Sequence, residues 1–180
     1  MIGLYNLWLI FVGIGIFAGI VMTIGDKLRG VKIENKEDHA NAKVTIVSMF
    51  PLLAFLGVTI FTPIVTGTLF WVGCVLIVLT GIIYILSIMA FVKAKKGLTT
   101  IGIYKTSRNP MYIAMFLIFI GFILMAWQFS LEMGILMIIV TILNITATHW
   151  MVLGEESFLE NKYKKQYIGY KQSVHRYLLF

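Results

Sequence analysis

Charged residues are missing from three long stretches of this sequence. No Asp, Glu, Lys or Arg occurs in residues 44–92, 109–131 or 133–154. Only 13% of the residues are charged and 59% are hydrophobic, whereas a soluble domain carries about 25% charged residues. A helix needs about 20 apolar residues to cross a bilayer, and backbone groups in lipid must be paired within the chain. The sequence therefore excludes an ordinary soluble domain and predicts membrane-spanning helices.

Cysteine is almost absent as well, since Cys74 is the only one. A lone cysteine forms neither an internal disulfide nor a metal site, so we expect Cys74 to pack between helices and expect no metal. The alternating pattern of a membrane β-barrel is also missing. The sequence favours one all-α integral membrane domain over residues 1–180.

The uncharged stretches divide into about five predicted transmembrane helices. The 49-residue stretch is too long for one crossing, and it contains the turn signals Thr62-Pro63 and Thr66-Gly67-Thr68. No basic residue precedes the first apolar stretch, so we expect a retained helix there rather than a signal peptide. The expected helices cover residues 4–24, 44–61, 69–91, 110–127 and 132–153, and a cytosolic amphipathic helix follows at 155–175.

All Lys and Arg residues are predicted to lie on one side of the membrane. The fifteen basic residues fall in the segments 27–43, 93–108 and 162–176, which lie on the same side if the chain crosses five times. Cytoplasmic loops are rich in Lys and Arg, so we expect this side in the cytoplasm and the N-terminus outside. The charge also suits anionic lipid head groups, and we expect lipid rather than nucleic acid as a partner.

Three groups of residues are candidates for a site, and the first is weak. Gly13 and Gly15, followed by Gly19, superficially resemble a dinucleotide-binding loop, but that loop follows a strand. Here the glycines lie in an apolar helix, where small residues allow close helix packing.

The second group lies in the segment that leads into the fourth predicted helix. Gly102 permits unusual backbone conformations, Asn109 suits a helix N-cap, and Pro110 suits the first helical turn. A capped helix entry explains these residues, and Tyr104 and Tyr112 are typical of a membrane interface.

The third group is the pair Glu155 and Glu156 at the predicted exit of the last transmembrane helix, a few residues after His149. The carboxylates can hold a cation or hydrogen-bond ribose hydroxyls or an ammonium group. The simpler interpretation is a solvated start of the tail.

Taken together, the second and third groups resemble the motifs of the integral-membrane methyltransferase superfamily. It includes the isoprenylcysteine carboxyl methyltransferases and the phospholipid N-methyltransferases. The family pattern is Gly-x-Tyr, Arg-His-Pro-x-Tyr, a helical hairpin, Glu-Glu-x-x-Leu and Tyr-x-x-Tyr-x-x-x-Val-x-Arg. The corresponding segments are residues 102–104, 108–112, 155–159 and 167–176, and the resemblance covers about residues 96–176.

The resemblance implies a methyltransferase that uses S-adenosylmethionine and acts on a membrane lipid or lipidated acceptor. The residues that it assigns to the cofactor are Lys96, Gly97, Leu98, Thr99, Gly102, Tyr104, Asn109, Pro110, Met111, Tyr112 and Glu155. Glu156, His149 and Arg108 are the candidates for catalysis. Glu156 or His149 is expected to accept the proton of an amine acceptor.

The acceptor itself stays open between a prenylcysteine-like carboxylate and a phospholipid amine. Asn109 stands where prenylcysteine enzymes have His, and Met151 where they have a substrate-binding Arg. The first departure favours the phospholipid branch, and the second disfavours a carboxylate acceptor. The glycine motif of the phospholipid branch is not evident in residues 69–91, however, and the C-terminal Tyr-Val-Arg motif favours the prenylcysteine branch. Two alternatives remain: a non-catalytic membrane or lipid-binding protein with a degenerate methyltransferase fold, and a relative of the sterol reductases that uses a nicotinamide cofactor. The sequence does not indicate the oligomeric state.

Overall fold

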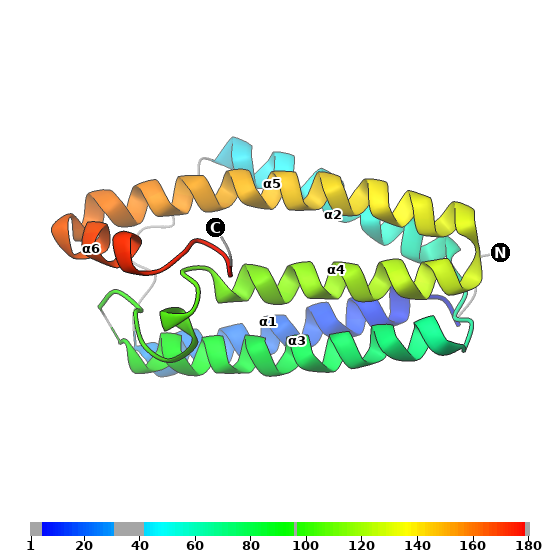
Figure 1. Ribbon diagram of the computed structural model, residues 1–180, viewed down its shortest axis with the longest axis horizontal. Coiled ribbons are helices and arrows are strands. Elements are labelled where there is room, and N and C mark those ends of the chain that lie inside the picture. The colour runs from blue at the N-terminus through cyan, green and yellow to red at the C-terminus, as the bar shows by residue number, and fades with distance from the viewer. Residues whose placement is uncertain (1–4, 31–41, 96, 179–180) are drawn as a thin grey trace.

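The computed structural model describes residues 5–30, 42–95 and 97–178, and these residues form helices and no strand. Four helices are long and apolar enough to cross a membrane, and a fifth, α2, contains the shorter apolar stretch Met49–Phe61. The prediction of an all-α integral membrane protein is confirmed. The helices are α1 (Trp8–Arg29), α2 (Ala42–Phe61), α3 (Thr68–Lys93), the short 3-10 helix η2 (Gly102–Lys105), α4 (Pro110–Phe129), α5 (Leu131–Tyr163) and α6 (Lys165–Ser173) (Figure 1).

The C-terminal region differs from the prediction of a separate amphipathic helix over residues 155–175. Helix α5 continues to Tyr163, and Lys164 then interrupts the helical path with a backbone φ of 46°. Only the nine residues of α6 follow. The apolar pattern ends near residue 153, but residues 154–163 contain no proline, so α5 extends beyond its apolar part in spite of Gly154. Glu155 and Glu156 consequently lie within α5, near the end of a long helix.

The long helices lie side by side, with α4 between α3 and α5 (Figure 1). Helix α1 packs against α3, and α2 packs against α5. Helices α3 and α4 approach closely at Gly73, where an added Cβ would lie 2.7 Å from the carbonyl oxygen of Gly121. Glycine at position 73 therefore allows the backbones of α3 and α4 to come this close.

An aromatic cluster forms the core of one half of the bundle. The ring of Phe55 in α2 lies 4.9 Å from that of Phe119 and 5.5 Å from that of Phe122, both in α4. Phe11 of α1 meets Phe122 edge-on at 5.7 Å. Tilted and edge-on contacts of this kind are the favoured geometries of aromatic pairs, so the cluster ties α1, α2 and α4 together.

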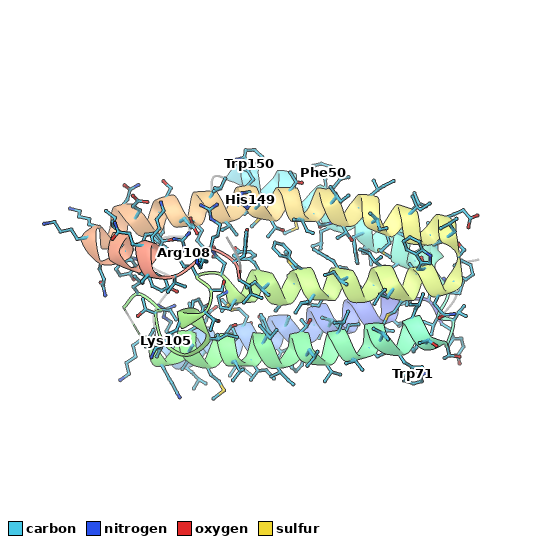
Figure 2. All side chains as sticks on the ribbon, viewed as in Figure 1. Phe50, Trp71, Lys105, Arg108, His149 and Trp150 are labelled. Carbon is cyan, nitrogen blue, oxygen red and sulfur yellow. The ribbon has the colours of Figure 1, made fainter. Side chains whose placement is uncertain are left out.

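The segments that carry most of the described basic residues lie at the other end of the bundle. The C-terminal ends of α1, α3 and α5, the linker with η2, and α6 all gather there (Figure 1). Lys105 and Arg108 lie at this end, and Trp71 lies towards the opposite end (Figure 2). The predicted grouping of Lys and Arg is therefore present in the described residues. The membrane side that this end faces stays a prediction.

Candidate active site

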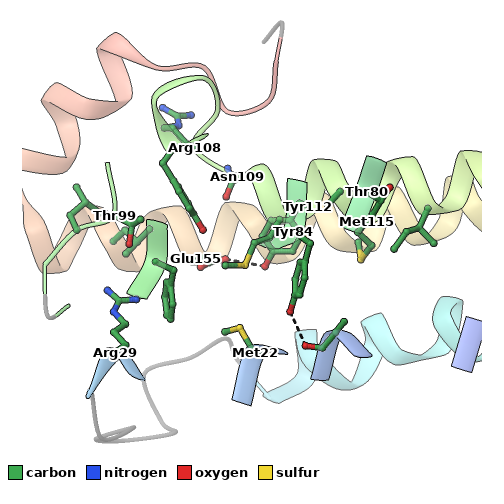
Figure 3. A pocket seen from close by; sticks show the side chains of 18 of the residues that line it. Met22, Arg29, Thr80, Tyr84, Thr99, Arg108, Asn109, Tyr112, Met115 and Glu155 are labelled. Carbon is green, nitrogen blue, oxygen red and sulfur yellow. Dashed lines mark hydrogen bonds between the residues drawn. The ribbon is translucent and has the colours of Figure 1, made fainter. Parts of the chain in front are cut away.

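A cavity of about 650 Å³ lies towards the basic end of the bundle (Figure 3). Its walls come from α1, α3, α4, α5, α6 and the linker between α3 and α4. One part is polar and includes Tyr104, Asn109, Tyr112 and Glu155. The other part is apolar and continues between the helices, and it is lined by Ile14, Ala18, Met22, Ile77, Met115 and Ile118. The cavity thus joins a polar chamber to an apolar arm.

Beside the polar part, an ion-pair cluster joins three distant segments of the chain. Arg108, just before α4, lies 3.1 Å from the Glu156 carboxylate of α5, and their side chains are only 7% and 6% exposed. Arg176, after α6, donates to both oxygens of the same carboxylate at 3.1 and 2.9 Å. Bidentate pairs of this kind are the strong charge-assisted hydrogen bonds. The cluster therefore fixes the start of α4 and the C-terminal segment against α5.

Hydrogen bonds to backbone carbonyls hold the C-terminal segment in the same place. The Arg108 amide donates to the carbonyl oxygen of His175 at 2.9 Å, and the Ser107 hydroxyl donates to that of Arg176 at 2.9 Å. Asn109 occupies the N-cap position of α4, but its side chain makes no capping hydrogen bond. Its amide group instead donates to Glu156 at 3.3 Å. Asn109 therefore connects α4 to α5 rather than capping α4.

The two adjacent glutamates of α5 have different environments. Glu155 lines the cavity, and the Tyr112 hydroxyl donates to one of its oxygens at 3.0 Å. Glu156 does not line the cavity and is 4% exposed. Successive residues on an α-helix point in directions about 100° apart, so only one of the pair faces the cavity. Glu155 is the carboxylate that a ligand in the described cavity can reach.

The linker and α6 meet at two tyrosines that also line the cavity. The Tyr170 hydroxyl donates to the carbonyl oxygen of Tyr104 at 2.5 Å. Burial raises the pKa of Tyr104 above its usual value and that of Tyr170 to about 12. Both hydroxyls therefore stay protonated at neutral pH. Gly102 begins η2 with a φ of 60°, a conformation that favours glycine, and so shapes the backbone before Tyr104.

A family comparison agrees with this convergence of motifs. The model of the phospholipid methyltransferase family matches residues 68–166, more than half of the chain, from the start of α3 into α6. The chain belongs to the phospholipid methyltransferase family. Searches of curated proteins and of solved structures found no significant match. Membership of the family supports a membrane methyltransferase in general and confirms the resemblance predicted from the sequence.

The structure brings most of the predicted site residues of this family member to one cavity. Those that line it are Gly97, Leu98, Thr99, Tyr104, Arg108, Asn109, Met111, Tyr112 and Glu155. Gly102 and Pro110 do not line it, and Lys96 lies outside the described residues.

Of the predicted catalytic residues, Arg108 lines the cavity and Glu156 and His149 do not. Arg108 lines it, but its guanidinium is engaged by Glu156. His149 lies away from the lining residues, and its Nδ1 atom is 3.1 Å from the Tyr177 hydroxyl. Neither Glu156 nor His149 lines the cavity, so the proton transfer expected of them has no geometric support in the described residues and stays a prediction.

Several residues that line the cavity were not predicted from the sequence to belong to the site. Arg29, at the end of α1, donates to the carbonyl oxygens of Lys95 and, at 3.0 Å, Gly97. Tyr84 of α3 donates to the carbonyl oxygen of Ala18 in α1 at 3.0 Å (Figure 3). The basic residues of segment 27–43 were interpreted as topology signals alone. No local pattern connects Arg29 with a linker 66 residues further along the chain.

Proposed function

We propose that this protein transfers a methyl group from S-adenosylmethionine to a membrane-embedded acceptor in the cavity at the basic end. The observation that carries the proposal is the position of Glu155. It stands on the wall of the polar chamber, hydrogen-bonded to Tyr112, within the segment that the family model matches. The apolar arm begins in the same cavity, so a polar cofactor and a lipid can meet there.

The described residues of the polar chamber fit the cofactor chemically. The Glu155 carboxylate suits its ammonium group or ribose hydroxyls, and the rings of Tyr104 and Tyr112 suit adenine or the sulfonium cation. Arg108 also lines the chamber, and its Nε–H is buried without a hydrogen-bond partner in the described chain. A buried donor of this kind favours an acceptor atom on a ligand. The cavity volume of about 650 Å³ falls within the usual range of ligand pockets, about 300–1,000 Å³.

The apolar arm supports an acceptor with a hydrocarbon chain. Ala18 and Met22 of α1 and Met115 and Ile118 of α4 line this arm. A hydrocarbon chain can leave the bilayer for such a wall without burying a polar group that lacks a partner. The family description supports a phospholipid amine head group as the methyl acceptor. A prenylcysteine-like carboxylate is the alternative acceptor class.

The protein contributes orientation and exclusion of water to the transfer. S-adenosylmethionine, when bound, would supply an activated methyl group on a sulfonium. Glu155, Tyr104 and Tyr112 would hold the cofactor beside the acceptor, so that the methyl group could pass to the acceptor's lone pair and leave S-adenosylhomocysteine behind. A protonated amine must first lose a proton, and Glu155 is the carboxylate among the described lining residues that can accept it, directly or through water.

The basic end of the bundle is proposed to face the cytoplasm, where S-adenosylmethionine would enter. The support for this orientation is the location of the described Lys and Arg residues at one end, because cytoplasmic loops carry an excess of both residues.

The test is methyl transfer by the purified full chain in vesicles. Vesicles of phosphatidylcholine with phosphatidylethanolamine are compared with vesicles of phosphatidylcholine with phosphatidylglycerol, both supplied with methyl-labelled S-adenosylmethionine. Label in the lipid fraction only when phosphatidylethanolamine is present supports the proposal. A parallel reaction with farnesylcysteine tests the carboxylate class. Binding of S-adenosylhomocysteine without transfer to any acceptor would favour the non-catalytic alternative.

A further inference from the structure

Arg29 and Arg108 both line the cavity, but their guanidinium groups contact different kinds of groups. Among the described lining residues, the fully charged cations are Arg29 and Arg108. The Arg108 guanidinium contacts the Glu156 carboxylate at 3.1 Å. Arg29 forms no ion pair with any residue that the structure describes, and its two hydrogen bonds go to backbone carbonyls. Its positive charge therefore has no carboxylate in contact within the described chain.

The Arg29 guanidinium is nevertheless held in a defined place. Its Nε donates to the carbonyl oxygen of Lys95, and its Nη2 donates to that of Gly97 at 3.0 Å. Its central carbon lies 3.7 Å from the centroid of the Phe91 ring. A guanidinium has five N–H donors, and these contacts use two of them. These contacts also hold the remaining N–H donors of Arg29 in a fixed orientation. A guanidinium held in this way can form a planar, two-point contact with an anion.

Helix α1 carries Arg29 and the apolar wall of the same cavity. Ile14, Ala18 and Met22 line the apolar arm, and Arg29 lines the polar end. At about 1.5 Å per residue, Ile14 and Arg29 are roughly 22 Å apart along the helix axis. This arrangement fits an amphiphile with its chain along α1 and an anionic group beside Arg29.

We propose that Arg29 binds the phosphate of the acceptor lipid and so positions the head group in the polar chamber. This inference rests on the proposed function, since it concerns the acceptor of that reaction. Arg29 lies outside the segment 68–166 that the family model matches. It stands at the basic end of α1, the level at which a membrane protein meets lipid phosphates. Arg29 is therefore a specificity-determining residue contributed by the part of this chain that the family model does not cover.

The other anion that Arg29 could reach is the carboxylate of the cofactor. The hydrogen bond to Gly97 places the guanidinium beside the linker of the cofactor chamber, so the two anions must be separated by experiment. The acceptor is favoured because Arg29 shares its helix with the apolar arm, whereas the predicted cofactor residues come from the linker, α4 and α5.

The test measures lipid binding without requiring turnover. The full chain is purified in an uncharged detergent, and its affinity is measured for oleoyl lysophosphatidic acid and for monoolein, which share one chain and differ in the phosphate. S-adenosylhomocysteine affinity is measured on the same samples. The variants are Arg29→Gln, Arg29→Lys and the matched control Lys27→Gln, an exposed basic residue on α1 outside the cavity lining.

We expect wild type and Lys27→Gln to prefer the lysophosphatidic acid. Arg29→Gln should weaken lysophosphatidic acid binding by about tenfold or more, the scale of a charged hydrogen bond. It should leave the affinities for monoolein and S-adenosylhomocysteine unchanged. Arg29→Lys should keep part of the preference because it keeps the charge.

Three results would overturn the assignment of Arg29. These are a phosphate preference that survives in Arg29→Gln, an equal loss of S-adenosylhomocysteine affinity, and a loss of all three ligands in both Arg29 variants. The last two would assign Arg29 to the cofactor or to folding. If S-adenosylhomocysteine fails to bind even to wild type, the proposed function is wrong as well, so the two failures can be told apart.

Discussion

The carboxylate of Glu156 lies 3.1 Å from the Arg108 guanidinium, and both side chains are almost completely buried. Because Arg176 also binds this carboxylate through two hydrogen bonds, Glu156 joins the start of α4 and the C-terminal segment after α6 to α5. Its contacts are those of a structural residue. Removing one partner of a buried ion pair leaves an uncompensated charge in the interior.

Glu156→Ala should therefore destabilise the fold by about 3–5 kcal/mol, the usual cost of breaking a buried pair. The matched control is Glu160→Ala on the same helix, which breaks the Lys171–Glu160 contact at 3.1 Å between side chains that are 42% and 41% exposed. That loss should cost less than about 1 kcal/mol. Thermal unfolding in detergent, followed by circular dichroism, compares the two. Equal melting temperatures for the two variants would contradict the structural role of Glu156.

Tyr112→Phe should weaken S-adenosylhomocysteine binding without disturbing the fold. The change removes the hydroxyl that donates to Glu155 at 3.0 Å and keeps the ring. The Glu155 carboxylate then loses the hydrogen bond that orients it towards a ligand. Tyr177→Phe is the matched control, because its hydroxyl contacts His149 and does not line the cavity. Isothermal titration should show a lower affinity for Tyr112→Phe alone, and an unchanged affinity would contradict the role of this contact.

Gly73→Ala should separate α3 from α4 and lower stability by about 1–3 kcal/mol, the usual cost of overpacking. The added Cβ would lie 2.7 Å from a backbone oxygen of Gly121, which cannot move aside as a side chain can. Gly81→Ala on the same helix meets no atom within 4 Å, and it should be neutral or gain up to about 1 kcal/mol from helix propensity. Melting temperatures in detergent test the pair. A Gly73→Ala protein as stable as Gly81→Ala would rule out the close approach.

Alkaline pH should destabilise the protein partly through Tyr170. Burial raises the pKa of Tyr170 to about 12, against about 10 in an unfolded chain. Between these values the unfolded chain has lost a proton that the folded chain keeps, so the free energy of unfolding falls as pH rises. Tyr170→Phe removes this proton from both states. Chemical unfolding at several alkaline pH values should give a shallower decline for Tyr170→Phe than for wild type, and parallel declines would contradict this account.

The sequence predicted the membrane helices and part of the polar lining of the cavity because both leave local signals. Gaps in the charged residues located the helices, and Pro110 marked the first turn of α4. The motifs at Tyr104 and Tyr112 indicated segments that the structure brings to one cavity. These features depend on local composition and on motifs of a few neighbouring residues, and both can be read from a single sequence.

Other features depend on contacts between distant residues and could not be predicted. The extension of α5 through Tyr163 decides that Glu155 faces the cavity and Glu156 faces the ion pair. Asn109 was expected to cap α4, but Glu156 provides another partner for its side chain. Arg29 meets its carbonyl partners only through the packing of α1 against α3. Nothing near Arg29 in the sequence indicates these contacts.

The most direct test of the central claim is equilibrium binding of S-adenosylhomocysteine to the purified full chain. Wild type is compared with Glu155→Ala, and Glu160→Ala serves as a control with an exposed carboxylate on the same helix. The proposed site predicts saturable binding to wild type and to Glu160→Ala, with an affinity lower by about tenfold or more in Glu155→Ala. Equal affinities for wild type and Glu155→Ala, or no binding to wild type, would contradict it.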